Sequence, residues 1–170
     1  MNKEGKLSKK RLAILLEDGF NNDEFELTRD IAKNEGARVD VVSSGNLEVK
    51  PYAESNAKRN KPVQVDSSHT DKSTYDGVVI VSGVIDHSQM AENEEIKAFI
   101  NREFEAHTPI VAIGSGEKIL EDAGVFESVD SPGKSESTKS FVRGQSVMFA
   151  KDMEDKKAFS DEFVDFLSKS

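Results

Sequence analysis

Short apolar runs alternate along the chain with longer stretches in which apolar residues recur every three or four positions. An isolated apolar run predicts a buried strand, and a three-to-four spacing predicts an amphipathic helix. The predicted strands cover residues 10–16, 39–42, 77–81 and 109–113, with weaker ones at 125–129 and 147–150. The predicted helices cover 21–34, 92–105, 117–123 and 155–167. We expect the first helix to be capped near Asn22 or Asp23.

The order of these elements predicts an α/β fold. Strand and helix alternate, which is typical of a doubly wound, mostly parallel sheet flanked by helices and joined by right-handed crossovers. The segment 45–73 departs from this alternation, because two short strand-like stretches, Leu47–Lys50 and Pro62–Val65, flank a polar run. That pattern predicts a β-hairpin inserted beside the main sheet. We expect a flexible basic leader over residues 1–9 and one domain over 10–170, while residues 130–139 should form a mobile loop.

Charge and composition narrow the range of partners. The 170 residues carry a formal net charge of -9 at pH 7, and such a surface repels nucleic acid and anionic membranes. The sequence has no apolar run near the ~20 residues that a membrane-spanning helix needs, and it has no secretory signal. We therefore expect a cytoplasmic protein that binds neither nucleic acid nor membranes.

The side chains available for chemistry are few. The chain has no cysteine, which excludes disulfides, thiolate metal ligands and a cysteine nucleophile. A histidine metal site would need all three histidines, His69, His87 and His107, to converge. We expect neither a metal nor a cofactor.

Ligands of doubly wound folds bind at the carboxyl ends of the parallel strands. Three turns qualify: Glu17–Gly19, the stretch from Ser82 to His87, and Gly114–Glu117. The last turn lacks the third glycine of a dinucleotide-binding fingerprint, and the chain contains no Walker sequence. The nucleophile elbow of serine hydrolases is also absent, because Ile113 stands where that motif has glycine.

Several interpretations of these turns remain open. Ser115 could act as a nucleophile, with His87 as its base and Asp86 or Asp18 as the orienting carboxylate. Alternatively, Ser115 caps the following helix and His87 is a solvated loop residue. The backbone of the turn from Gly114 could also bind an anion. Nearby carboxylates would repel an anion but could hold a divalent cation; they are Glu17, Asp18 and Glu117.

Three blocks of the sequence, 10–44, 75–84 and 110–125, resemble the ThiJ/PfpI superfamily. The resemblance implies a flavodoxin-like, class I glutamine amidotransferase-like fold. Active members read Ala-Ile-Cys-His-Gly where this chain has Ala112–Gly116, so Gly114 replaces the nucleophile and Ser115 the histidine. The glutamate that supports the cysteine aligns with Gly19, and Pro-Gly-Gly becomes Val81–Gly83. Because glycine offers neither a nucleophile nor a proton acceptor, the resemblance implies that the inherited mechanism is lost.

Within that superfamily, the C-terminal domain of large-subunit catalases is similar at Leu15–Gly19, at the hairpin before Tyr75–Val79 and at Ala112–Glu117. This likeness implies a non-catalytic, stress-related module without haem that stabilises, oligomerises or acts like a chaperone. It implies a homo-oligomer, above all a dimer, with unfolded clients or a fused catalase core as partners. The expected vestigial pocket comprises Glu17, Asp18, Gly19, Ser82, Gly83, Gly114, Ser115, Gly116 and Glu117.

Overall fold

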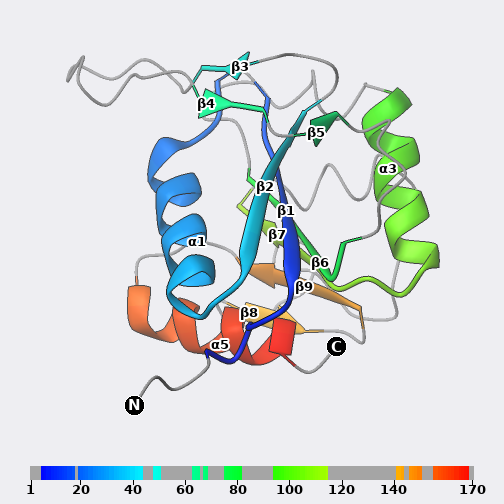
Figure 1. Ribbon diagram of the computed structural model, residues 1–170. Helices are drawn as coiled ribbons and strands as arrows, with labels where there is room; N and C mark the ends of the chain where they lie inside the picture. The colour runs from blue at the N-terminus through cyan, green and yellow to red at the C-terminus, as the bar shows by residue number, and fades with distance from the viewer. Residues whose placement is uncertain are drawn as a thin grey trace.

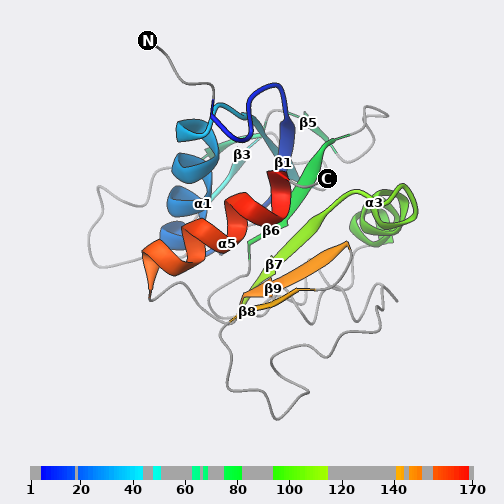
Figure 2. The same ribbon diagram turned by 90° about the horizontal axis from the view of Figure 1, so that it is seen from below.

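The computed structural model contains the doubly wound sheet that the alternation predicts (Figures 1 and 2). It describes residues 5–17, 19–43, 48–50, 63–65, 67–68, 75–81, 94–114, 141–143, 146–150 and 155–168. The main sheet has seven strands in the order β5-β2-β1-β6-β7-β9-β8. All neighbouring strands are parallel except β8 and β9. The strands are β1 (Arg11–Leu15), β2 (Arg38–Ser43), β5 (Ser67–Ser68), β6 (Gly77–Ile80), β7 (Ile110–Ile113), β8 (Phe141–Arg143) and β9 (Val147–Ala150).

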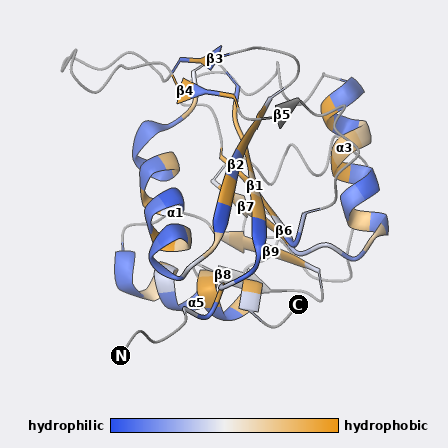
Figure 3. Cartoon of the chain, viewed as in Figure 1, coloured by the Kyte–Doolittle hydropathy of each residue, from blue (hydrophilic) through white to orange (hydrophobic). Residues whose placement is uncertain are grey.

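Helices cover both faces of the sheet. Helices α1 (Asn22–Asn34) and α5 (Lys156–Ser168) pack on one face, and α3 (Glu94–Glu105) packs on the other (Figure 2). Because successive side chains of a strand point to opposite faces, β1 contributes to two cores. Leu12 and Ile14 face α1 and α5, whereas Ala13 and Leu15 face α3. In Figure 3 β1 and β2 are mainly hydrophobic apart from their first residues, whereas the helices mix hydrophilic and hydrophobic residues.

The predicted hairpin is confirmed. Strands β3 (Glu48–Val49) and β4 (Val63–Gln64) pair antiparallel in a separate two-stranded sheet. The sequence did not predict β5 or β8, since each has only two or three residues and no apolar run marks it. The predicted elements at 117–123 and 125–129, and the predicted loop at 130–139, lie outside the described residues. Within the described part of the chain, no helix combines the length and apolarity of a membrane span.

The cap of α1 lies one residue earlier than the sequence suggested. Asn21 is the N-cap, and its side chain accepts a hydrogen bond of 3.2 Å from the backbone N–H of Glu24. Asn22, one of the two expected caps, is the first helical residue and instead donates its side-chain amide to Glu26. The prediction failed by one position because consecutive asparagines offer the same capping chemistry.

We expected a flexible leader over residues 1–9, of which the structure describes residues 5–9, and these are folded. Residues 5–10, here called the strap, fold into turns against the end of α1. The backbone N–H of Leu7 donates to the carbonyl of Glu35 at 3.0 Å, and the N–H of Lys6 donates to the Glu35 carboxylate at 2.9 Å. Leu7 is fully buried and belongs to the core on the α1 face. The lysines suggested a solvated segment. Leu7, the one apolar residue among them, is instead buried and holds the strap against the domain.

The end of α3 gives a first testable prediction. His107 closes α3 in the left-handed conformation, with φ 62°, and its N–H donates to Phe104 while that of Thr108 donates to Glu103. α1 ends with the same hydrogen-bond pattern, but there the left-handed residue is Gly36. A left-handed residue with a side chain costs roughly 1–2 kcal/mol, and glycine avoids much of this cost. His107→Gly should therefore raise the free energy of unfolding by about 1 kcal/mol in urea titrations. His107→Ala is the control and should give no such gain, so equal effects of the two variants would contradict the prediction.

Candidate functional site

Two predicted site positions follow parallel strands at the same edge of the sheet. Gly19 lies beyond the end of β1, and Gly114 directly follows β7. Strand β6 separates β1 from β7, and it pairs with both in parallel register. At roughly 4.8 Å between neighbouring strands, the ends of β1 and β7 lie about 10 Å apart. The sheet therefore brings these two positions to the edge where doubly wound folds bind ligands.

Gly114 occupies the turn in which the resemblance places a nucleophile. Its φ is 58°, in the left-handed region, and its N–H donates a hydrogen bond of 2.8 Å to the carbonyl of Ala150. Nucleophile elbows hold their catalytic side chain on a sharp, strained turn of this kind. This chain keeps a left-handed residue after the strand, but the residue has no side chain. The position therefore lacks both the strain and the nucleophile.

Gly19 also has a left-handed backbone, with φ 87°. Its N–H donates to the carbonyl of Lys50 at 2.8 Å, which ties this turn to the residue after β3. A Cβ built on Gly19 would meet no heavy atom of the described residues within 4 Å. The position at which the resemblance places the supporting carboxylate is therefore a glycine whose surroundings would not block the first atom of a side chain.

Of the three carboxylates that the sequence places at this edge, Glu17 lies in the described part of the chain. It is buried, and its Oε1 accepts a hydrogen bond of 3.1 Å from the hydroxyl of Ser43 at the end of β2. Ser43 is fully buried, so substrate cannot reach its hydroxyl. The sequence identified Glu17 but not its partner. Leu15 of β1 is in register with Val42 of the parallel strand β2. The residues that follow these two therefore lie near one another, so this pairing would have indicated Ser43 as a partner of Glu17.

The other predicted site residues lie outside the described part of the chain: Asp18, Ser82, Gly83, Asp86, His87, Ser115, Gly116 and Glu117. The arrangement of Ser115 with His87, and the anion-binding turn after Gly114, therefore stay predictions. Among the described residues, no group of three or more His, Cys, Asp or Glu side chains is arranged to hold a metal ion. Of the histidines, His107 lies at the end of α3.

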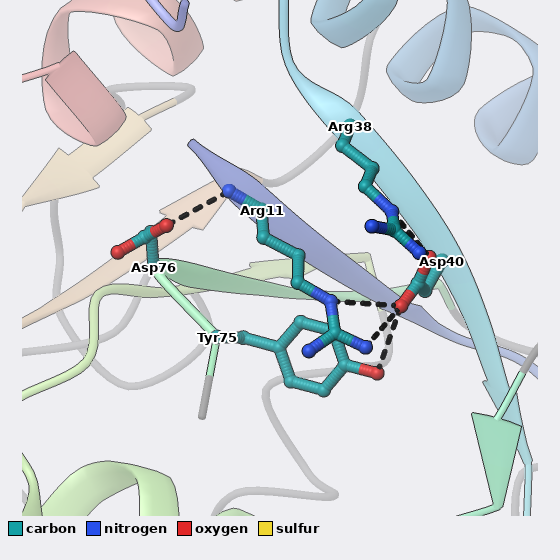
Figure 4. A network of polar contacts seen from close by, with 5 residues as sticks. All are labelled: Arg11, Arg38, Asp40, Tyr75 and Asp76. Carbon is teal, nitrogen blue, oxygen red and sulfur yellow. Dashed lines mark hydrogen bonds and ion pairs between the residues drawn. The ribbon is translucent and has the colours of Figure 1, made fainter. Parts of the chain in front are cut away.

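A polar network occupies the opposite edge, where the parallel strands begin (Figure 4). The guanidinium of Arg11 donates to the carboxylate of Asp40 at 2.7 and 3.0 Å, and the Tyr75 hydroxyl donates to the same carboxylate oxygen at 3.3 Å. The guanidinium of Arg11 also lies over the Tyr75 ring, 4.6 Å from its centroid. Arg38 pairs with the other oxygen of Asp40 at 3.7 Å, and Asp76 accepts from the backbone N–H of Arg11 at 2.8 Å. The network lies at the far end of the strands from the candidate site and joins β1 and β2 to the two residues that precede β6.

The fold and the turns define a doubly wound α/β protein with a left-handed glycine directly after β7. The model of the DJ-1/PfpI family matches residues 10–164. The chain belongs to that family. It is also 27% identical over 162 residues to Catalase-2 of Bacillus subtilis (strain 168). That match covers 93% of this chain but 20% of the catalase, so the chain spans about a fifth of its relative's length.

Solved structures agree with this family assignment at the level of the fold. The two-domain protein with DJ-1/ThiJ/PfpI-like and ferritin-like domains from Anabaena variabilis superposes with a TM-score of 0.79 at 19% identity, covering 92% of this chain and 48% of that one. The ThiJ/PfpI domain protein of Brachyspira murdochii gives 0.78 at 16% identity, covering 96% and 98%. DJ-1beta of Drosophila melanogaster gives 0.76 at 18% identity, covering 95% and 91%.

Proposed function

We propose that this chain is a non-catalytic member of the DJ-1/PfpI family that acts as a stabilising and oligomerising module, with a chaperone-like capacity for unfolded clients. The observation that carries the proposal is the pair of glycines at the site edge. Gly19 and Gly114 stand where the resemblance places the supporting carboxylate and the nucleophile. Without those side chains, the edge has neither the nucleophile nor the proton acceptor of the family mechanism.

The relation to Catalase-2 supports this proposal. Because the match covers 20% of that protein, this chain corresponds to one part of a longer relative. A module of this size that accompanies a catalase core, fused or separate, would contribute stability and assembly rather than turnover. The partners that we propose are therefore a second copy of this chain, a catalase core and partly unfolded clients.

Turnover measurements test the non-catalytic part of the proposal. We expect the wild type and Ser115→Ala to be equally inactive on a panel of generic esters, amides and methylglyoxal. Ser160→Ala, on helix α5, is the matched control for the loss of a serine hydroxyl. If the wild type and Ser160→Ala turn over a substrate and Ser115→Ala does not, the protein is instead a hydrolase that uses Ser115.

Assembly and client protection test the other part. Light scattering over a range of protein concentrations should reveal an oligomer, and equimolar protein should slow the aggregation of a heat-denatured client. Bovine serum albumin at the same concentration controls for crowding. A monomer at every concentration that leaves aggregation unchanged would contradict the proposal.

A further inference from the structure

The strap has the properties of an element that can be exchanged between molecules. It is six residues long and directly precedes β1. Its hydrogen bonds to Glu35 attach it to the turn between α1 and β2. Lys6 and Leu7 donate their N–H groups to Glu35, and Leu7 inserts into the core. The approach is close, because a Cβ on Gly5 would overlap the carbonyl of Glu35. The strap therefore has a specific seat, formed by Glu35, Gly36 and Ala37.

Strain is located where the strap joins β1. Lys9 has φ 68°, which places a residue with a side chain in the left-handed region. That conformation is unfavourable for a lysine, and Lys9 adopts it in the turn by which the strap folds back onto its own domain. If the strap crossed to a second molecule, Lys6 and Leu7 could keep their hydrogen bonds to an equivalent Glu35 while Lys9 relaxed, at the cost of the hydrogen bond from the Lys10 N–H to the Leu7 carbonyl. Strained hinges of this kind favour domain exchange.

From these observations we propose that two copies of this chain exchange their straps about Lys9, so that residues 5–8 of each molecule occupy the seat of the other. The inference rests on the proposed oligomerising function and identifies the surface and the partner, a second copy. Because each copy both gives and receives a strap, the assembly is a closed dimer with twofold symmetry.

A designed disulfide distinguishes exchanged from unexchanged straps. A Cβ on Gly36 would lie 3.5 Å from the Cβ of Ser8, within the range of about 3.5–4.5 Å for disulfides. Since the chain has no cysteine of its own, Ser8→Cys with Gly36→Cys introduces the only thiols. After equilibration at high protein concentration, dilution and oxidation, non-reducing electrophoresis should show a covalent dimer. Ser8→Cys alone gives the background of accidental cross-links.

The outcomes separate this inference from the proposed function. A dimer in light scattering that yields only internally cross-linked monomer would overturn strap exchange and leave oligomerisation standing. A monomer at every concentration would overturn both. A covalent dimer well above the Ser8→Cys background supports the exchange.

A second pair of variants tests the hinge in the chain without cysteines. Lys9→Gly removes the strain from the unexchanged form, so the dimer should dissociate on the order of tenfold more readily in analytical ultracentrifugation. Lys10→Gly loses the same charge and gains the same backbone freedom, but Lys10 is not left-handed. It should leave the dimer nearly unchanged, and equal effects of the two variants would contradict the role of hinge strain.

Discussion

Leu7→Ala is expected to lower the free energy of unfolding by about 3 kcal/mol, within the range for truncating a fully buried leucine. Leu7 has no exposed surface and belongs to the same core as Phe25 of α1 and Phe159 of α5. Truncation removes buried apolar area and leaves a cavity, because the strap stays held by the hydrogen bonds from the N–H groups of Lys6 and Leu7 to Glu35, which the smaller side chain does not change.

Urea titrations of Leu7→Ala and Lys6→Ala measure this effect. Lys6 is the neighbouring strap residue, but its side chain is exposed, so Lys6→Ala should change stability by less than about 0.5 kcal/mol. If Leu7→Ala cost no more than its neighbour, residues 5–10 would be the solvated leader that the lysines suggest. A large difference between the two variants identifies the strap as part of the folded domain.

The strap also shows what the sequence could and could not predict about the fold. β1, β6 and β7 were predictable because each is an uninterrupted apolar run, and α5 because its phenylalanines recur at helical spacing. A single leucine among lysines has no periodicity, and its burial depends on a seat at residues 35–37, which are distant in sequence. β5 escaped prediction for a similar reason, since two serines become a strand only by pairing with β2.

The candidate site was predictable in its residue types but not in its geometry. The resemblance identified Gly19 and Gly114 as the positions that lack catalytic side chains. The left-handed backbone at both glycines was not predictable from the residues alone, since glycine also adopts ordinary conformations. The contact between Glu17 and Ser43 depends on the pairing of β1 with β2. Pairing between strands is a tertiary property that a pattern along one strand does not contain.

The network at the opposite edge of the sheet gives the second large prediction. Asp40→Ala should lower the free energy of unfolding by about 3 kcal/mol, because removing one partner of a largely buried ion pair leaves the other partners poorly compensated. The Asp40 side chain is 8% exposed and that of Arg11 28%. The variant removes the carboxylate that accepts from both Arg11 and the buried hydroxyl of Tyr75.

Three further variants show whether this cost comes from the buried part of the network. Arg38→Ala should cost less than about 0.5 kcal/mol, since the Arg38 side chain is 76% exposed and lies 3.7 Å from Asp40. Asp40→Asn keeps the shape of the side chain and one acceptor oxygen, so its cost should fall between those of Arg38→Ala and Asp40→Ala. A double-mutant cycle of Asp40→Ala with Tyr75→Phe should give a coupling above about 0.5 kcal/mol, as for residues in one hydrogen-bond network. If the effects of Asp40→Ala and Tyr75→Phe were additive, the buried hydrogen bond between them would contribute nothing measurable. If Arg38→Ala were as damaging as Asp40→Ala, exposed charge rather than the buried contacts would stabilise this edge of the sheet.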